Sequence, residues 1–337
     1  MAGDRQQITD SLAVTPRRRV LAAAALAPLL AAAPTPARAR PAARPGESLA
    51  SAAQKLIKPV HTTLSDWKEV AKVLGGPGDM KHKVMYHSGF PRRDLRVFSH
   101  HVHVKPSLAL GSHISFVRYT DHSNLLMGDV VVTEHELQGF VDTLQEHRIG
   151  VTALHKHLLS QTPDVWWLHV HGHGQDPVAL ARGIHAAFEG TGAPHPRASD
   201  QAKPDDLDTD GIDHALGAKG SGDDGIYKCI FVRREKISDG DRLLPPGLGS
   251  TSAFNFQPLG NGRAALSADC CMVADEVQRV LRLLRKAGVK LVELHNHGLR
   301  DKPRLFFVHV WAVGDAVHLA RALRTVLDAT NVTPAGA

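Results

Sequence analysis

Residues Leu154–His173 read LHKHLLSQTPDVWWLHVHGH, and a related stretch, LHNHGLRDKPRLFFVHVWAV, follows 140 positions later at Leu294–Val313. Each copy ends one apolar run with His-x-His and carries a further histidine inside the next run. A proline, Pro163 or Pro303, lies midway between the two runs. Two short apolar runs on either side of such a turn predict a β-hairpin.

The predicted hairpin brings its histidines together. Alternate residues of a strand face the same side, so His155 and His157 share a face, as do His169 and His171. Pairing about Pro163 places His157 opposite His169 and His155 opposite His171, at cross-strand Cβ distances of roughly 5 Å. The corresponding positions of the second copy are His295, His297, His309 and Trp311.

Neutral imidazoles at this spacing are typical of a transition-metal site. Zinc is the expected ion because it accepts imidazole nitrogens at about 2.0–2.1 Å, and copper, iron and nickel accept the same donors. Three histidines with a free position, which Trp311 leaves, favour a catalytic ion, whereas a fourth ligand at His171 favours a structural, storage or redox role. The alternative is a hairpin whose histidines are solvated or hydrogen-bonded to one another.

Several carboxylates lie near these histidines in the sequence. Glu293 precedes the second His-x-His pair by two positions and so faces the same side, as a fourth ligand or a general base. Glu136 is a second candidate base, although a helix-capping box with Thr133 explains it better. Asp129 and its counterpart Asp269 could orient a ligand histidine through its second nitrogen or form a turn at a strand end.

The hairpin is one part of a larger duplication. Met85–Asp94 aligns with Ile226–Glu235, and Gly128–Leu137 aligns with Ala268–Val277. Together with the hairpins and the helices, the matches share offsets of 139–142 residues. The sequence therefore predicts an α+β fold of two tandem homologous units, each a mostly antiparallel sheet backed by helices, related by a pseudo-two-fold axis.

Hydrophobic periodicity gives the order of elements within one unit. In the first unit, helices are expected at 64–74, 134–147 and 177–188, and strands at 84–90, 95–104, 114–119, 125–132, 149–158 and 165–172. Helices at 275–286 and 315–327 repeat the last two in the second unit. Asp176 followed by Pro177 is a helix-start signal.

Composition and the repeat together predict the domain boundaries. We expect a signal peptide at 1–39, a flexible segment at 40–56, the first unit at 57–192, a linker rich in Pro, Asp and Gly at 193–225, the second unit at 226–331 and a tail at 332–337. The linker includes, at 205–217, the start of the second unit.

The N-terminus has the parts of an export signal. Arg17-Arg18-Arg19 has the twin-arginine arrangement, Val20–Ala33 is a short apolar run, and Ala37-Arg38-Ala39 is an A-x-A cleavage site. Pro28 within so short a run argues against a membrane span, and no cysteine follows the run, so no lipid or other membrane anchor is expected. These features predict a periplasmic or secreted protein.

Charge and composition exclude one class of function and leave another open. Residues 1–39 hold five arginines and two aspartates, so they contribute +3 of the formal charge of +6. The remaining +3 argues against a nucleic-acid binder. The pairs Arg92–Arg93 and Arg233–Arg234 could receive an anionic substrate or serve as edge-strand charges.

The adjacent Cys270 and Cys271 are expected to pack in a buried strand, without a disulfide.

A set of motifs links the chain to a known family. They are Phe90-Pro-Arg-Arg-Asp-Leu95, Leu126-Met-Gly-Asp-Val130, Val151-Thr-Ala-Leu-His-Lys-His157, Trp167-Leu-His-Val-His171, Leu294-His-Asn-His297 and Phe306-Phe-Val-His309. Through them the chain resembles, from about Trp67 to Asp328, the LppY/LpqO family of exported bacterial proteins with a duplicated domain of unknown function. The family favours Asn between the paired histidines, which is kept at Asn296 and replaced by Lys156, and its named members are lipoproteins. The resemblance implies export and the two-unit architecture, and no particular reaction.

Three functions are compatible with the sequence. The first is an exported metal-dependent enzyme, of hydrolase or lyase type, whose ion activates water or polarises a small-molecule substrate at the bottom of a cleft. The second is a non-catalytic periplasmic protein that binds and buffers metal. The third is a sensing module with pH-responsive histidines. The sequence leaves open the substrate, the oligomeric state, and whether one or both units bind the ion.

Overall fold

The computed structural model describes residues 56–335, which belong to one compact unit, Ala52–Ala337. The expected signal peptide at 1–39 lies outside these residues, as do nearly all of the segment at 40–56 and the end of the tail. Among the described helices, none is long and apolar enough to cross a membrane.

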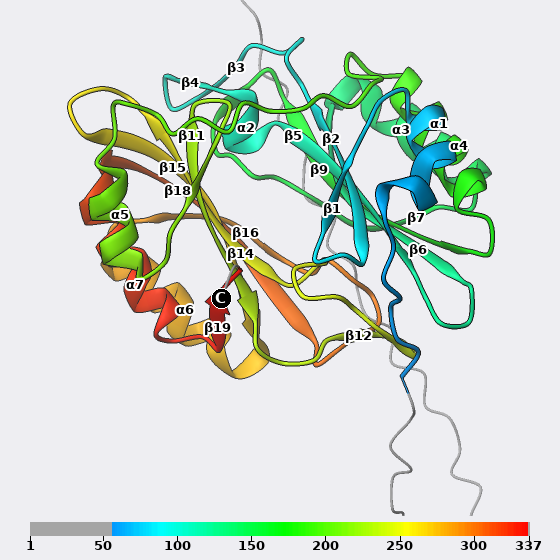
Figure 1. The fold of residues 1–337 in the computed structure, drawn as a ribbon. Coiled ribbons are helices and arrows are strands. Elements are labelled where there is room, and N and C mark those ends of the chain that lie inside the picture. The colour runs from blue at the N-terminus through cyan, green and yellow to red at the C-terminus, as the bar shows by residue number, and fades with distance from the viewer. Residues whose placement is uncertain (1–55, 336–337) are drawn as a thin grey trace, which may run out of the picture. The chain divides into compact units, whose positions relative to one another are not determined.

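The first repeat is built on a six-stranded sheet with the order β1-β2-β5-β6-β9-β7 (Figure 1). The strands are β1 (Asp79–Lys81), β2 (Met85–Pro91), β5 (Gly111–Arg118), β6 (Asn124–Thr133), β7 (Gly150–His155) and β9 (Val165–Gly174). The helices are η1 (Leu64–Trp67), α1 (Lys68–Leu74), α2 (Pro106–Ala109), α3 (Glu134–Glu146) and α4 (Pro177–Glu189). A small sheet joins β4 (Val102–Val104), β3 (Val97–Ser99) and β8 (Gln161–Thr162).

The second repeat has the same arrangement, in the order β10-β11-β14-β15-β18-β16, with β19 added beside β11. Its strands are β10 (Ser221–Asp223), β11 (Ile226–Arg233), β14 (Thr251–Pro258), β15 (Arg263–Val273), β16 (Lys290–His295), β18 (Leu305–Asp315) and β19 (Val332–Pro334). The helices are α5 (Thr209–Leu216), α6 (Ala274–Lys286) and α7 (Ala316–Leu327), and the small sheet joins β13 (Arg242–Leu243), β12 (Ser238–Asp239) and β17 (Asp301–Lys302). The shared strand order confirms the predicted duplication and the α+β fold.

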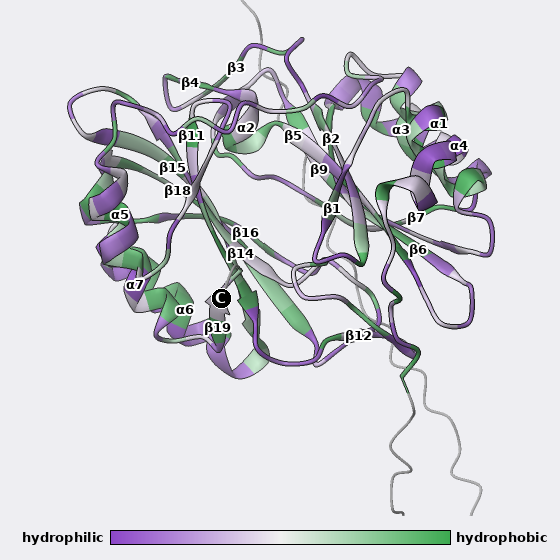
Figure 2. Cartoon of the chain, in the orientation of Figure 1, coloured by the Kyte–Doolittle hydropathy of each residue, from purple (hydrophilic) through white to green (hydrophobic). Residues whose placement is uncertain are grey.

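Each large sheet has one face covered by helices and one face turned toward the other repeat. On β6, Leu126 and Val130 pack with Phe140 of α3, whereas the next residue, Val131, lies in a cluster with Trp311 of the second repeat. Figure 1 shows α3 and α4 on one side, α6 and α7 on the other, and the sheets between them. In Figure 2, hydrophobic residues follow the strands near β14, while polar residues colour much of α1 and α5. The second face of each sheet is therefore buried by the other repeat.

The histidine hairpin differs from the predicted hairpin in its register. β7 ends at His155, and Ala153, rather than His157, lies opposite His169 on β9. The register is thus shifted by four residues from a pairing about Pro163. This shift in register is a consequence of tertiary structure, because part of the connecting segment forms β8 and pairs with β3 instead of closing a tight turn.

One other segment also departs from the predictions. The strand expected at 95–104 is divided into β3 and β4 by His100 and His101, whose φ values of 44° and 69° are those of a two-residue hairpin turn. The segment at 193–225 contains β10 and α5, and α5 lies within 205–217, where the start of the second unit is expected.

Candidate metal centre

Six histidines, three from each repeat, meet between the two sheets. In the first repeat His155 ends β7, His157 follows it and His169 lies on β9. Their counterparts in the second repeat are His295 at the end of β16, His297 after it and His309 on β18. Because strand residues alternate between faces, these side chains lie on the faces that the helices do not cover. We call this group the histidine centre.

The closest ring contacts of the histidine centre run between the repeats. Ring centroids are 4.0 Å apart for His155 and His295, 3.8 Å for His157 and His309, and 3.8 Å for His169 and His297. Exchanging the repeats turns the contact between His157 and His309 into the contact between His297 and His169. The contact between His155 and His295 is unchanged, so the pseudo-two-fold axis lies beside this pair. The prediction of separate histidine groups, one in each repeat, is therefore corrected, because the repeats contribute to a single group.

The histidine centre is buried, and burial keeps five of its six imidazoles neutral. His155, His169 and His309 are 1%, 7% and 5% exposed. Burial, with the neighbouring imidazoles, lowers the pKa of His169, His295 and His297 to about 3 and holds the pKa of His155 and His309 well below the ordinary value. Neutral imidazole is the form that binds a metal, so no proton has to leave these rings first.

One aspartate from each repeat stands beside the centre. Asp129 Oδ2 is 3.3 Å from Nε2 of His157, and Asp269 Oδ2 is 3.5 Å from Nε2 of His297. Asp129 lies within β6 and Asp269 within β15, so neither forms a turn at a strand end. The remaining role is to orient a ligand histidine. Burial raises the pKa of Asp269 to about 7. Burial also opposes ionisation of Asp129, but His157 and His169 hold the pKa of its carboxyl below the usual value.

Several buried polar atoms of the centre have no hydrogen-bond partner. They are Nδ1 of His155, Nε2 of His169, both ring nitrogens of His295, Nε2 of His297 and of His309, and Oδ1 of Asp129 and of Asp269. An unpartnered buried polar atom costs about 1–3 kcal/mol, so this concentration indicates that the centre accommodates a ligand. Nitrogens of His155, His169 and His295 lie within 4.8 Å of one another, as do those of His155, His157 and His309. These groups could hold a metal ion.

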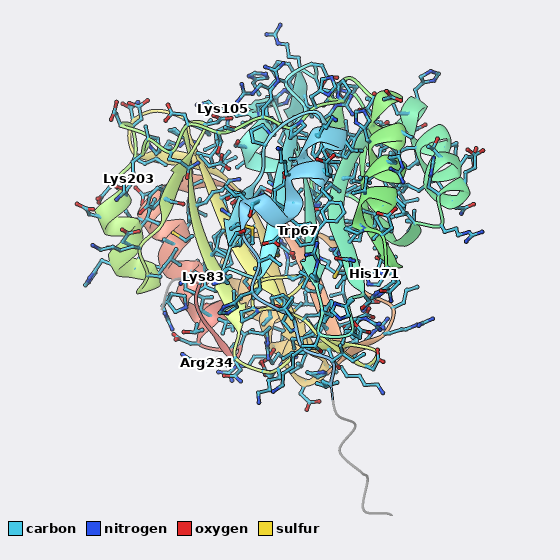
Figure 3. All side chains as sticks on the ribbon, turned by 45° about the vertical axis from the view of Figure 1, so that its right-hand side comes forward. Trp67, Lys83, Lys105, His171, Lys203 and Arg234 are labelled. Carbon is cyan, nitrogen blue, oxygen red and sulfur yellow. The ribbon has the colours of Figure 1, made fainter. Side chains whose placement is uncertain are left out.

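His171 lies apart from the histidine centre, contrary to its predicted place opposite His155. On β9 His171, which is labelled in Figure 3, is opposite Gly150. Its Nε2 is 3.0 Å from Oδ2 of Asp239 on β12. Nε2 of His173 is 3.0 Å from the same oxygen, and the three residues form a further group with metal-ligand spacing. Asp239 was not predicted as a site residue, because nothing in its local sequence distinguishes it.

Glu293 lies next to the centre and beside a cavity. Its carboxylate accepts a hydrogen bond from the backbone N–H of Lys156, so it links the two repeats between the His-x-His pairs. A cavity of about 320 Å³ is lined by Glu293, Lys156, Leu158, Gln161, Asp164 and neighbouring residues. This position is compatible with acid–base chemistry, whereas the groups with metal-ligand spacing do not include Glu293.

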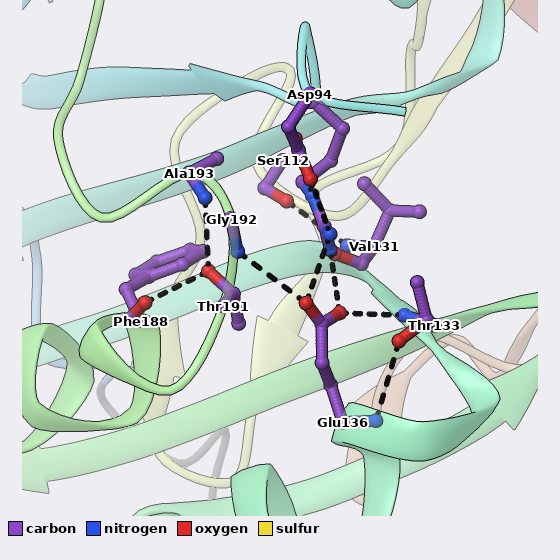
Figure 4. Close-up of polar contacts among 10 residues, drawn as sticks. Asp94, Ser112, Val131, Thr133, Glu136, Phe188, Thr191, Gly192 and Ala193 are labelled. Carbon is purple, nitrogen blue, oxygen red and sulfur yellow. Dashed lines mark hydrogen bonds and ion pairs between the residues drawn. The ribbon is translucent and has the colours of Figure 1, made fainter. Parts of the chain in front are cut away.

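Glu136 has a structural role at the start of α3. Its carboxylate accepts hydrogen bonds from the backbone N–H of Thr133 at 2.7 Å and from two nitrogens of Arg92 at 2.7 and 2.9 Å (Figure 4). The backbone N–H of Gly192 also donates to it. Both oxygens are therefore occupied, which favours the capping alternative over a general base.

Arg92 and its counterpart Arg233 are buried rather than available to a substrate. Arg92 is 1% exposed and pairs with Asp94 as well as Glu136. The second repeat repeats this arrangement, with Arg233 held by Glu235 and Glu276. Because both guanidinium groups are neutralised inside the protein, neither one can serve as the anion receptor that the arginine pairs suggested.

Fold and site together define a duplicated α+β protein with a histidine-rich centre between its halves, able to hold a metal ion. The chain belongs to the family described as Domain of Unknown Function (DUF1259), whose model matches residues 68–190 and 210–329. The two matches correspond to the two repeats, and the family description carries no activity.

Comparisons with individual proteins add little. No curated protein matches the chain. Among solved structures, a trimeric bacterial microcompartment shell protein, PduB, is similar over 74% of this chain and 92% of its own, at 10% identity and a TM-score of 0.17. A TM-score of that size does not indicate a shared fold.

Proposed function

We propose that this protein is a metal-dependent enzyme, of hydrolase or lyase type, whose ion is bound by the histidine centre. The proposed ligands are His155, His157, His169, His295, His297 and His309. One observation carries the proposal, namely the convergence of buried, neutral imidazole nitrogens without hydrogen-bond partners. Zinc is the first expectation because all the donors are nitrogens, and copper, iron and nickel accept the same set. A bound ion would acidify water or polarise a substrate oxygen.

The cavity beside Glu293 favours an enzyme over a metal buffer. A buffer requires ions that exchange readily, and burial of His155 and His169 to within a few per cent of complete opposes exchange. An enzyme requires a place for a substrate, and the cavity lined by Glu293 and Lys156 is the proposed place. The ammonium group of Lys156 pairs with Asp164, and Glu293 is the proposed general base. The non-catalytic metal binder remains the alternative function.

We further propose that the chain is exported to the periplasm or secreted as a member of the LppY/LpqO family. The twin-arginine arrangement and the A-x-A site at 37–39 support export, and the shared motifs support the family name. A small-molecule substrate is the proposed partner, and neither nucleic acid nor a membrane anchor is part of the proposal.

Substitution of Glu293 in zinc-loaded protein tests the proposed enzymatic function. The protein is freed of metal, reloaded with zinc, passed through gel filtration and assayed with p-nitrophenyl esters and phosphates. Glu293→Gln should lower the hydrolysis rate about 100-fold, as general-base removal does, while zinc content measured by elemental analysis stays unchanged. The matched control is Glu146→Gln, since Glu146 is exposed at the end of α3, does not line the cavity and should retain activity.

Three other results would count against the proposal. Absence of bound zinc in the reloaded wild type would contradict metal binding by the centre. Bound zinc without hydrolysis of any ester would favour the non-catalytic alternative. Equal losses in Glu293→Gln and Glu146→Gln would remove Glu293 as the base.

A further inference from the structure

We infer that His171, His173 and Asp239 bind a divalent transition-metal ion at a site of their own, separate from the histidine centre. The two histidines lie on β9 of the first repeat, and the aspartate lies on β12 of the second repeat. We call this group the surface triad. An ion bound there would join the two repeats, and its binding goes beyond the proposed function and does not depend on it.

The side chains of the surface triad already converge on one point. His171 and His173 are alternate residues of β9 and so face the same side of the sheet. Nε2 of each lies 3.0 Å from Oδ2 of Asp239, and the three donor atoms lie within 4.8 Å of one another. Ligand atoms bound to one zinc ion at about 2.0–2.1 Å lie no more than roughly 4.2 Å apart. Both nitrogen–oxygen distances therefore suit one shared ion, and each histidine contributes a single nitrogen.

The carboxylate of the surface triad has no permanent positive charge beside it. Asp239 pairs with two imidazoles, which are charged only when protonated. Arg242, which lies opposite Asp239 on β13, pairs instead with Asp121 and Asp241. Among the residues that the structure describes, no lysine or arginine side chain pairs with Asp239. A cation bound between the three side chains would neutralise this carboxylate.

The duplication defines a second position that is equivalent to the surface triad. Its residues lie 140 positions away from those of the triad, on β18 and β3. They are Trp311 and Val313 in place of the two histidines, and Ser99 in place of the aspartate. The structure supports the match of the serine, because β3 pairs with β8 as β12 pairs with β17.

The equivalent position keeps none of the three metal donors. Trp311 is buried in an apolar cluster that includes Val97 of β3, and the hydroxyl of Ser99 donates a hydrogen bond to the carbonyl oxygen of Leu159. Two histidines and an aspartate thus occur together at one position and are all replaced at the other. This distribution is the one expected of residues that share a ligand.

The surface triad differs from the histidine centre in its exposure and its donors. The side chains of His171, His173 and Asp239 are 18%, 35% and 12% exposed, so solvent can reach a bound ion. Two imidazoles with one carboxylate suit iron(II) or zinc and leave coordination positions open for water. We therefore expect an ion that exchanges with the solution.

Counting bound zinc in matched variants tests the inference. Each protein is freed of metal and brought to equilibrium by dialysis against buffered zinc, and its zinc content is measured by elemental analysis. Asp239→Asn and His173→Gln should each hold about one ion fewer per chain than the wild type. The matched control is Asp241→Asn, because the Asp241 side chain is 43% exposed and pairs with Arg242. This variant should keep the wild-type zinc content, and circular dichroism checks that each variant is folded.

A variant of the histidine centre separates this inference from the proposed function. His155→Gln removes the residue shared by both groups with metal-ligand spacing in the centre and should keep the ion of the surface triad. If the wild type holds a single ion that Asp239→Asn loses and His155→Gln keeps, the surface triad is supported and metal binding by the centre is contradicted.

Three results would overturn the inference. Equal, non-zero zinc contents in Asp239→Asn and the wild type would do so and would leave the proposed centre standing. Absence of zinc from the wild type would overturn both. Equal losses in Asp239→Asn and Asp241→Asn would show that the loss of a negative charge, rather than of a ligand, lowers the zinc content. If Asp239→Asn does not fold, the zinc content of His173→Gln decides in the same way.

Discussion

Glu136 joins the start of α3 to the buried guanidinium of Arg92 through both carboxylate oxygens. The same residue also caps the helix through the backbone N–H of Thr133. From the sequence the capping box could be predicted, because Thr and Glu three residues apart at a helix start are a local signal. The partnership with Arg92 could not, because it joins positions 44 residues apart that only the folded sheet brings together.

Glu136→Gln should lower the free energy of unfolding by about 2 kcal/mol at pH 7, because hydrogen bonds to charged groups contribute roughly 1.5–3 kcal/mol. Burial opposes ionisation, but hydrogen bonds from Arg92 and Thr133 hold the pKa of Glu136 below its usual value. A carboxyl whose pKa is lower in the folded state stabilises the protein above its unfolded pKa of about 4.3. That stabilisation is lost as the pH falls through the folded pKa.

Urea unfolding at several pH values measures this effect. The difference between wild type and Glu136→Gln should be full at pH 7 and should shrink below about pH 4. Glu134→Gln is the matched control, because Glu134 is exposed in the same helical turn and should change stability by less than about 0.5 kcal/mol. A difference that stays constant in acid would show that the ion pair is not its source.

At the scale of elements, β9 presents two adjacent tryptophans to opposite faces of its sheet. Trp167 is fully buried, donates its ring N–H to the carbonyl oxygen of Ala109 at 2.9 Å and stacks on His157 at a centroid distance of 4.4 Å. Trp166 is half-buried on the helix side, with Nζ of Lys156 3.8 Å from its ring centroid. Only Trp167 supports the histidine centre.

Trp167→Ala should lower the free energy of unfolding by about 3–5 kcal/mol and should reduce zinc content, because His157 loses the surface on which it stacks. Trp166→Ala should cost only about 1 kcal/mol and should leave zinc content unchanged. Chemical unfolding and elemental analysis of the two variants measure these effects. Equal zinc loss in both variants would show that His157 does not depend on Trp167.

The helices and most strands could be predicted from the sequence, but the register of the histidine hairpin could not. The helix expected at 134–147 is α3 at Glu134–Glu146, and the one expected at 177–188 is α4 at Pro177–Glu189. Caps and periodicity are local signals that suffice for such elements. The register depends on a bulge between Val151 and Ala153 and on the pairing of β8 with β3. Both are consequences of tertiary structure.

At the scale of the whole molecule, duplication supplies the histidine centre. The repeat and the period-2 pattern, both visible in the sequence, place three histidines on the same face of each sheet. Helices cover the opposite face, so the histidine face of one repeat needs a partner, and the other repeat provides it. The six histidines could therefore be predicted from the sequence. Their assembly into one centre could not, because no local pattern specifies how two sheets pack together.

Anomalous diffraction at the zinc edge, from crystals of zinc-loaded protein, tests most directly the claim that one metal centre lies between the repeats. We predict anomalous density among the six rings, within about 2.0–2.1 Å of nitrogens from both His155 and His295 and their neighbours. Density bound within the centre by histidines of one repeat only, or no density in the centre, would contradict the claim.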